Sequence, residues 1–282
     1  MANFLIPDKT ITLTIGDRTL TVHQKIIPDD MVAPRNVADW VRKGQPMKPR
    51  EQVGPNGRPL GVCVHNTNDI RVASGTNAAE QYSRATFNGN MAGVIVHYYV
   101  WRDEIWQLLR LDERGWHAAD GRTRRAGRRP GQRIGGNLDT IAIEAIGPLA
   151  ETTEITALLC AWLCREFELD PALDLWQHAD FAARNCPLYI RRSGWQKFVE
   201  QVQGFAVATP KATASPQPPI TQPAVTAPKE NTSPPVAESP PAVLFRVQAG
   251  AFRERQNAEA LLARLHDSGF ANAFITTTGG ST

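Results

Sequence analysis

A long segment rich in proline, threonine, alanine and serine divides the chain and limits what the rest of it can fold into. This composition runs from Thr209 to Pro241. Such a segment cannot bury enough apolar surface to offset the entropy lost on folding, so we expect an extended linker over residues 205–242. The sequence therefore predicts a globular domain at residues 1–204 and a small separate segment at residues 243–282.

The first 204 residues have the pattern of one α/β domain. Apolar residues make up 42% of the chain and charged residues 21%, which is enough apolar surface for a buried core. Apolar residues alternate with threonines on both sides of Gly16-Asp17, which predicts a hairpin at residues 10–23. The expected fold class is α/β, a central mixed β-sheet flanked by helices, with its core at about 58–204 and the hairpin in an N-terminal extension at 1–57. Apolar runs and helical spacing place further strands at 60–64, 94–100, 105–111, 140–146 and 173–176, and helices at 77–86, 152–168 and 193–202.

The net charge of +3 is mild. It argues against a dedicated nucleic-acid binder, which has a strong basic excess, and is compatible with an anionic polymer as partner. Six arginines lie between Arg122 and Arg133, and they are either a solvated loop or a guide for such a polymer. No run approaches the roughly 18 apolar residues that cross a bilayer, so we expect no transmembrane segment. The oligomeric state does not follow from the sequence.

Two of the six histidines end apolar runs. These are His65 and His178, and Cys186 follows His178 by eight residues across a loop that can fold back. Two imidazoles and a thiolate make a suitable set of ligands for Zn²⁺ and leave a fourth position for water. The spacing alone leaves other interpretations open, because a histidine at a strand end can be a hydrogen-bonded structural residue and a Cys-Pro pair is commonly structural.

Five segments, in order, carry a resemblance to one family. The run Val62-Cys63-Val64-His65-Asn66-Thr67 resembles the first metal-ligand strand of the type-2 N-acetylmuramoyl-L-alanine amidases, a superfamily that includes the peptidoglycan recognition proteins. The central hairpin of that family is resembled by His97–Val100 with Ile105–Leu108, and its Trp-His-Ala signature by Gly115–Ala118. Its Ile-Gly-Ile-Glu strand is resembled by Ile141–Glu144, and its last two ligands by His178 with Cys186-Pro187.

The resemblance implies a role for each matching residue. His65, His178 and Cys186 would hold Zn²⁺, and Glu144 would be the general base. Because Glu144 lies in an otherwise apolar strand, desolvation should raise its pKa; judged from the strand alone, it could equally face solvent. The family often has lysine where this chain has Arg184, which can stabilise an oxyanion but does not donate a proton.

The Trp-His-Ala segment lines the substrate cleft in this family. Trp116 and His117 are therefore expected to contact substrate, with a loop histidine packed beside a tryptophan as the alternative for His117. His97 is expected to be structural.

The implied activity is zinc-dependent hydrolysis of the amide bond between N-acetylmuramic acid and L-alanine in bacterial peptidoglycan. A non-catalytic peptidoglycan-binding module and a structural zinc protein are the alternatives, and the presence of both Cys186 and Glu144 favours catalysis. The N-terminus lacks the basic and apolar regions of a signal peptide. We therefore expect the cell wall or extracellular space to be reached by another route, such as host lysis.

The C-terminal segment resembles the beginning of a SPOR domain, a module that binds peptidoglycan glycan strands. Phe245–Phe252 resembles its opening strand and Asn257–Leu261 its first helix. About half of the usual module is expected at residues 243–282, which we interpret as a partial α+β segment that binds peptidoglycan or as a remnant.

Overall fold

The protein is described by a computed structural model covering residues 4–31, 48–49, 51–68, 77–91, 93–207 and scattered positions between 255 and 276. It divides into two compact units, residues 1–216 and 217–282. The first contains a seven-stranded mixed sheet in the order β1-β2-β5-β4-β8-β3-β9. Its strands are β1 (Lys9–Ile15), β2 (Arg18–Gln24), β3 (Gly61–Thr67), β4 (Tyr98–Trp101), β5 (Glu104–Gln107), β8 (Thr140–Ile146) and β9 (Leu175–Gln177).

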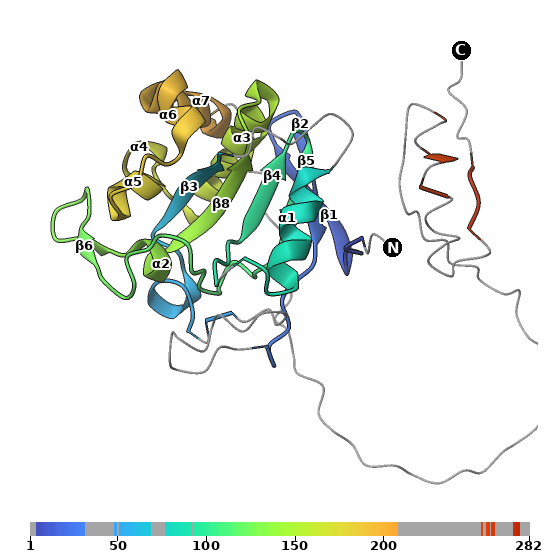
Figure 1. Ribbon diagram of the computed structural model, residues 1–282. Helices are drawn as coiled ribbons and strands as arrows, with labels where there is room; N and C mark the ends of the chain where they lie inside the picture. The colour runs from blue at the N-terminus through green and yellow to red at the C-terminus, as the bar shows by residue number, and fades with distance from the viewer. Residues whose placement is uncertain are drawn as a thin grey trace, which may run out of the picture. The chain divides into compact units, whose positions relative to one another are not determined.

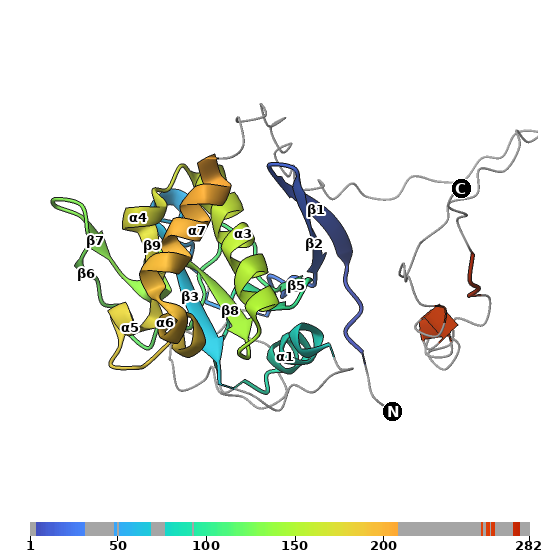
Figure 2. The same cartoon turned by 90° about the horizontal axis from the view of Figure 1, so that it is seen from above.

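Helices cover both faces of this sheet, as the sequence predicted (Figure 1). The helix α3 (Ala150–Phe167) runs beside α7 (Trp195–Val207) over one face (Figure 2). The opposite face packs against α1 (Ala78–Phe87), which Asn77 caps by accepting a hydrogen bond from Glu80 N–H. Shorter elements complete the unit: α2 (Gly136–Asp139), α4 (Pro171–Asp174), α5 (His178–Phe181), α6 (Leu188–Ser193), a 3₁₀ turn at Pro55–Gly57, and a two-stranded ribbon of β6 (Arg125–Ala126) and β7 (Arg133–Ile134).

Strand β3 lies between β8 and the edge strand β9 and runs parallel to both. Because successive side chains of a strand point to opposite faces, Val62 and Val64 join the core under α3 and α7. Cys63 and His65 alternate with them and point to the other face. The same alternation in β8 places Ile143 in the core and Glu144 opposite it. The face away from α3 and α7 therefore carries the polar side chains.

The predicted N-terminal hairpin is confirmed. Its strands β1 and β2 pair in register from Lys9↔Gln24 to Ile15↔Arg18. Gly16 has φ of 67°, the conformation that a two-residue turn requires at its first position and that glycine adopts without strain.

Several predicted boundaries were wrong. The predicted strand 94–100 begins as β4 only at Tyr98, and residues 171–174, which overlap the predicted last strand, form α4. The helix α3 starts at Ala150, without a side-chain cap. Thr152, where the helix was expected to begin, lies in its first turn and accepts a hydrogen bond from the backbone N–H of Arg102 (2.8 Å). This contact ties the start of α3 to the turn between β4 and β5.

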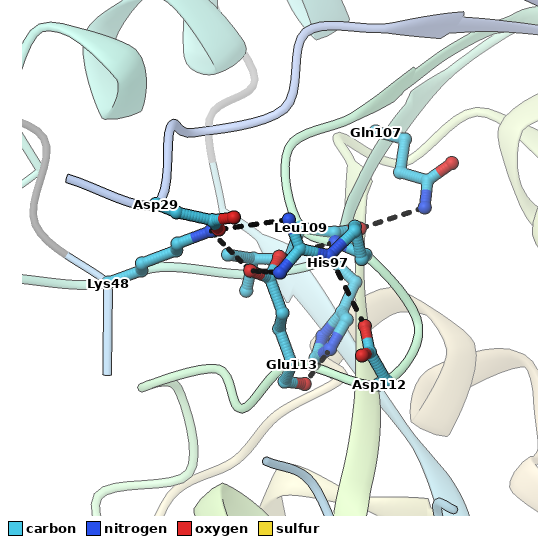
Figure 3. A network of polar contacts seen from close by, with 8 residues as sticks. Asp29, Lys48, His97, Gln107, Leu109, Asp112 and Glu113 are labelled. Atoms are coloured by element: carbon cyan, nitrogen blue, oxygen red, sulfur yellow. Dashed lines mark hydrogen bonds and ion pairs between the residues drawn. The ribbon is translucent and has the colours of Figure 1, made fainter. Parts of the chain in front are cut away.

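A partly buried network of charges joins Lys48 to the loop after β5. Lys48 Nζ contacts the carboxylates of Asp29 and Glu113, and the three side chains point toward one another in Figure 3. Arg110 bonds to the same two carboxylates. His97 lies beneath the network, and its Nε2 bonds to the backbone carbonyl of Glu113 (2.9 Å). Lys48 and Glu113 are both almost fully buried, so each needs the other to offset its desolvation.

The arginine loop is held to the domain by acidic side chains. Arg129 pairs with buried Asp174, and Arg124 forms two hydrogen bonds with Asp139 (both 2.7 Å). Arg128 lies over the ring of Trp176. Further ion pairs join Arg122 to Glu51 and Arg128 to Asp180. These ion pairs neutralise much of the loop's charge. They favour a structural role for the arginines over a role in guiding anionic polymers.

The second unit contains helical positions at 255, 258, 259, 261 and 262, which overlap the segment Asn257–Leu261 that resembles the first helix of a SPOR domain. Residues 273–276 have no regular structure. The predicted strand Phe245–Phe252 and the linker lie outside the described residues. Within the described part of the chain, no helix is long and apolar enough to cross a membrane.

Candidate active site

Parallel pairing of β3 with β8 sets the first two site residues side by side. His65 is the register partner of Glu144, and strand alternation points both side chains to the face away from α3. Tyr99 on β4 is the partner of Glu144 on its other side. Neighbouring strands of a sheet lie about 4.8 Å apart, so the three residues are adjacent.

The turn after β9 brings two more residues to the same place. His178 begins α5, and the carboxylate of Asp180 fixes the start of this helix by accepting a hydrogen bond from the backbone N–H of Gln177 (2.9 Å). The following loop folds back, because the N–H of Ala179 donates to the carbonyl of Cys186 (2.9 Å). The loop from His178 to Cys186 therefore folds back, as its length allows, and brings the two side chains together.

His65, His178 and Cys186 form one cluster. The Nδ1 atoms of His65 and His178 are 3.2 Å apart, and Cys186 Sγ lies 3.9 Å from His65 Nδ1. One potential ligand atom from each of the three residues lies within 4.8 Å of the others. Burial lowers the pKa of His65 well below its usual value, and it also lowers the pKa of His178. The rings are therefore neutral at neutral pH.

The other nitrogen of His65 faces the domain interior. Its Nε2 lies 3.0 Å from His117 Nδ1 and 3.3 Å from Cys63 Sγ. His117 is held in turn by Asn137, whose Oδ1 accepts hydrogen bonds from the backbone N–H groups of His117 and Ala118. The ring of His65 is therefore fixed on both sides. His65, His117 and Cys63 make a second group with metal-ligand spacing, but Cys63 does not line the cavity that His65 and His117 border.

All seven residues singled out from the sequence border one cavity of about 680 Å³. Sequence reasoning missed six others, which are asparagines and small or apolar residues whose types do not by themselves indicate a site. The complete lining is His65, Asn66, Asn68, Val94, Trp116, His117, Ala119, Glu144, His178, Arg184, Asn185, Cys186 and Leu188.

The cavity sets the electrostatics of its acid and its thiol. Burial raises the pKa of Glu144 to about 8, the direction predicted from its apolar strand. Burial, together with the nearby Glu144 carboxylate, raises the pKa of Cys186 to about 12. Arg184 is exposed at the rim, and its charge contributes to the lowered pKa of His178.

Comparison with known proteins identifies the domain that carries this cavity. Residues 55–188 match the family Amidase_2, N-acetylmuramoyl-L-alanine amidase. The chain contains a domain of this amidase family. Residues 241–282 match the SPOR domain, so both predicted resemblances are confirmed.

The amidase domain also has named relatives. It is 28% identical, over 162 residues, to the N-acetylmuramoyl-L-alanine amidase XlyA of Bacillus subtilis (strain 168), a match that covers 54% of this chain and 49% of XlyA. The chain thus spans about half the length of this relative. Among solved structures, the catalytic domain of XlyA is 26% identical, with 64% of this chain and 98% of that chain covered and a TM-score of 0.46. A mutant endolysin from Bacillus subtilis is 27% identical, with 65% and 99% covered and a TM-score of 0.47.

Proposed function

We propose that this protein is a zinc-dependent amidase that hydrolyses the bond between N-acetylmuramic acid and L-alanine in peptidoglycan. The proposal rests on one observation above all. Two neutral imidazoles, a thiol and an acid of raised pKa border a single open cavity in a domain of the amidase family.

The spacing of His65, His178 and Cys186 suits Zn²⁺. With tetrahedral bonds of about 2.05 Å to nitrogen and about 2.3 Å to sulfur, ligand atoms lie about 3.3 Å (N to N) and about 3.6 Å (N to S) apart. The corresponding separations here are 3.2 and 3.9 Å. The rings are neutral, as metal ligands must be. The high pKa of Cys186 means that its thiolate needs a cation beside it.

A structural zinc protein would require a fourth protein ligand. Among the described residues, each cluster of potential ligands contains three members, and the two clusters share His65. The cluster with Cys186 opens to the cavity, which leaves room for water and substrate. This openness favours a catalytic site over a structural one.

When bound, Zn²⁺ would supply a Lewis acid that activates water and polarises the scissile carbonyl. Glu144 would accept the proton of the attacking water and return it to the nitrogen of the departing L-alanine. A carboxyl whose pKa lies near the working pH can do both. Arg184 at the rim would stabilise the negative charge that develops on the carbonyl oxygen. Trp116 would form part of the wall against which substrate lies.

The variant Glu144→Gln tests this function because it keeps the shape of the side chain and removes the base. We expect the purified full-length variant to bind zinc like the wild type and to release peptide from peptidoglycan at least about 100-fold more slowly. An unchanged rate would overturn the assignment of Glu144. If the wild type binds zinc and peptidoglycan but releases no peptide, the protein is a recognition module.

We also propose a cell-wall location and peptidoglycan binding by the C-terminal segment, supported by the SPOR match at residues 241–282. The division into a catalytic domain at 1–204, a linker at 205–242 and a binding segment at 243–282 remains part of this proposal. In the structure α7 ends at Val207, close to the predicted domain limit.

A further inference from the structure

Asn66 lies at the centre of the candidate site, although no role follows from its place in the sequence. It is 7% exposed and follows His65 on β3. Its side-chain Nδ2 donates to the carbonyl of Ala145 (3.0 Å), the residue after Glu144. Its Oδ1 accepts from the backbone N–H groups of Tyr189 (3.1 Å) and Ile190 (3.2 Å).

The two N–H groups bonded to Asn66 belong to the first turn of α6. Such groups have no partner within their own helix, and α6 has no side-chain cap of its own at Pro187. Asn66 therefore caps α6 from a distant strand. Because Cys186 immediately precedes Pro187, this cap also fixes where Cys186 lies.

The backbone of Asn66 contacts the thiol as well. Its N–H lies 3.4 Å from Cys186 Sγ, and this contact lowers the pKa of Cys186, against the larger effect of burial. One residue thus joins the strand of His65, the strand of Glu144 and the start of the helix after Cys186. An amide side chain suits this place because it provides a donor for one carbonyl and an acceptor for two N–H groups.

We propose that Asn66 is a positioning residue, whose side chain holds Cys186 at ligand distance from His65 and in fixed relation to Glu144. The inference rests on the proposed zinc site. Neighbours of metal ligands that fix ligand orientation typically change metal affinity roughly 10- to 100-fold when replaced. Substitutions at Asn66 keep the backbone N–H, so they test the side chain alone.

Two variants and a matched control test this proposal in the full-length protein. Asn66→Leu removes all three side-chain hydrogen bonds, whereas Asn66→Asp keeps the acceptor for α6, loses the donor to Ala145 and adds a carboxylate. Thr156→Val removes a buried hydrogen bond within α3, from Thr156 Oγ1 to the Thr152 carbonyl, beneath the opposite face of the sheet. The readouts are zinc affinity by chelator competition, the thiolate charge-transfer band of the Co²⁺-substituted protein, and the melting temperature.

We expect Asn66→Leu to bind zinc roughly 10- to 100-fold more weakly and to have a diminished charge-transfer band. Asn66→Asp should recover most of the affinity, and Thr156→Val should lower the melting temperature while keeping wild-type affinity. Wild-type affinity and band in Asn66→Leu would overturn the inference, as would an equal loss of affinity in Thr156→Val. If Asn66→Leu does not fold, the test rests on Asn66→Asp. A zinc affinity in Asn66→Asp as low as that of a variant lacking a metal ligand would also contradict the inference. A wild type that binds no zinc would instead refute the proposed function.

Discussion

Acidification should destabilise the amidase domain through His97, a buried histidine outside the cavity. Its Nδ1 accepts from the N–H of Ala142 (3.0 Å), and its Nε2 bonds to the carbonyl of Glu113 (2.9 Å). These partners require a neutral ring with its proton on Nε2. Burial lowers the pKa of His97 from 6.5 to about 4.

The sign of the effect follows from proton binding. Because its pKa is lower in the folded state, the folded protein binds fewer protons than the unfolded chain between about pH 6.5 and pH 4. Stability from this residue is therefore fully present above pH 6.5 and is lost as the pH falls through this window. At about pH 4.5 the loss amounts to about 2 kcal/mol.

The variant His97→Asn isolates this contribution. Asparagine keeps an acceptor near Ala142 but leaves the Glu113 carbonyl without its donor, which should cost about 1–3 kcal/mol at neutral pH. Between pH 7 and about pH 4.5 the variant should then lose about 2 kcal/mol less than the wild type. The assay is denaturant unfolding of the metal-free protein at both pH values.

Thr86→Val, which removes a buried hydrogen bond to Tyr99 but no group that titrates in this range, is the control. It should be destabilised equally at the two pH values. If His97→Asn and the wild type lose the same stability on acidification, the explanation through His97 is refuted.

Two further predictions concern His117 and the arginine loop. His117→Ala should weaken zinc binding roughly 10-fold or more, because His65 Nε2 loses its nearer partner and keeps only the Cys63 thiol at 3.3 Å. His117→Asn, whose amide oxygen can replace Nδ1, should lose less; equal zinc affinities in the two variants would contradict this role. Arg129→Ala should destabilise the domain by about 2 kcal/mol because Asp174 stays buried without its cation. The exposed Arg125→Ala should change the free energy of unfolding by less than about 0.5 kcal/mol; equal effects of the two substitutions would show that the Arg129–Asp174 pair does not hold the loop.

The sequence was most informative where strand alternation decides which face a side chain takes. The polar interruption of β8 at Glu144 and the histidine within β3 were visible as breaks in apolar runs, and parallel pairing made them neighbours. The meeting of His178 and Cys186 with His65 followed only from the family resemblance, because loop closure depends on contacts that spacing does not encode.

Other features depended on partners far along the chain. Asn66 bonds to N–H groups more than a hundred residues away, so nothing local distinguishes it from any strand asparagine. The arginines of the 122–133 loop looked like free charge because their carboxylate partners lie as far away as Glu51 and Asp174. Short helices such as α5 and α6 contain too few turns to produce a periodic pattern.

The central claim is tested most directly by measuring zinc content together with peptide release from purified peptidoglycan, for the wild type and Cys186→Ala. The account predicts about one zinc per wild-type chain, new L-alanine amino termini, and the loss of both in the variant. A wild type without zinc, or a variant that retains zinc and activity, would contradict the assigned ligands and the mechanism built on them.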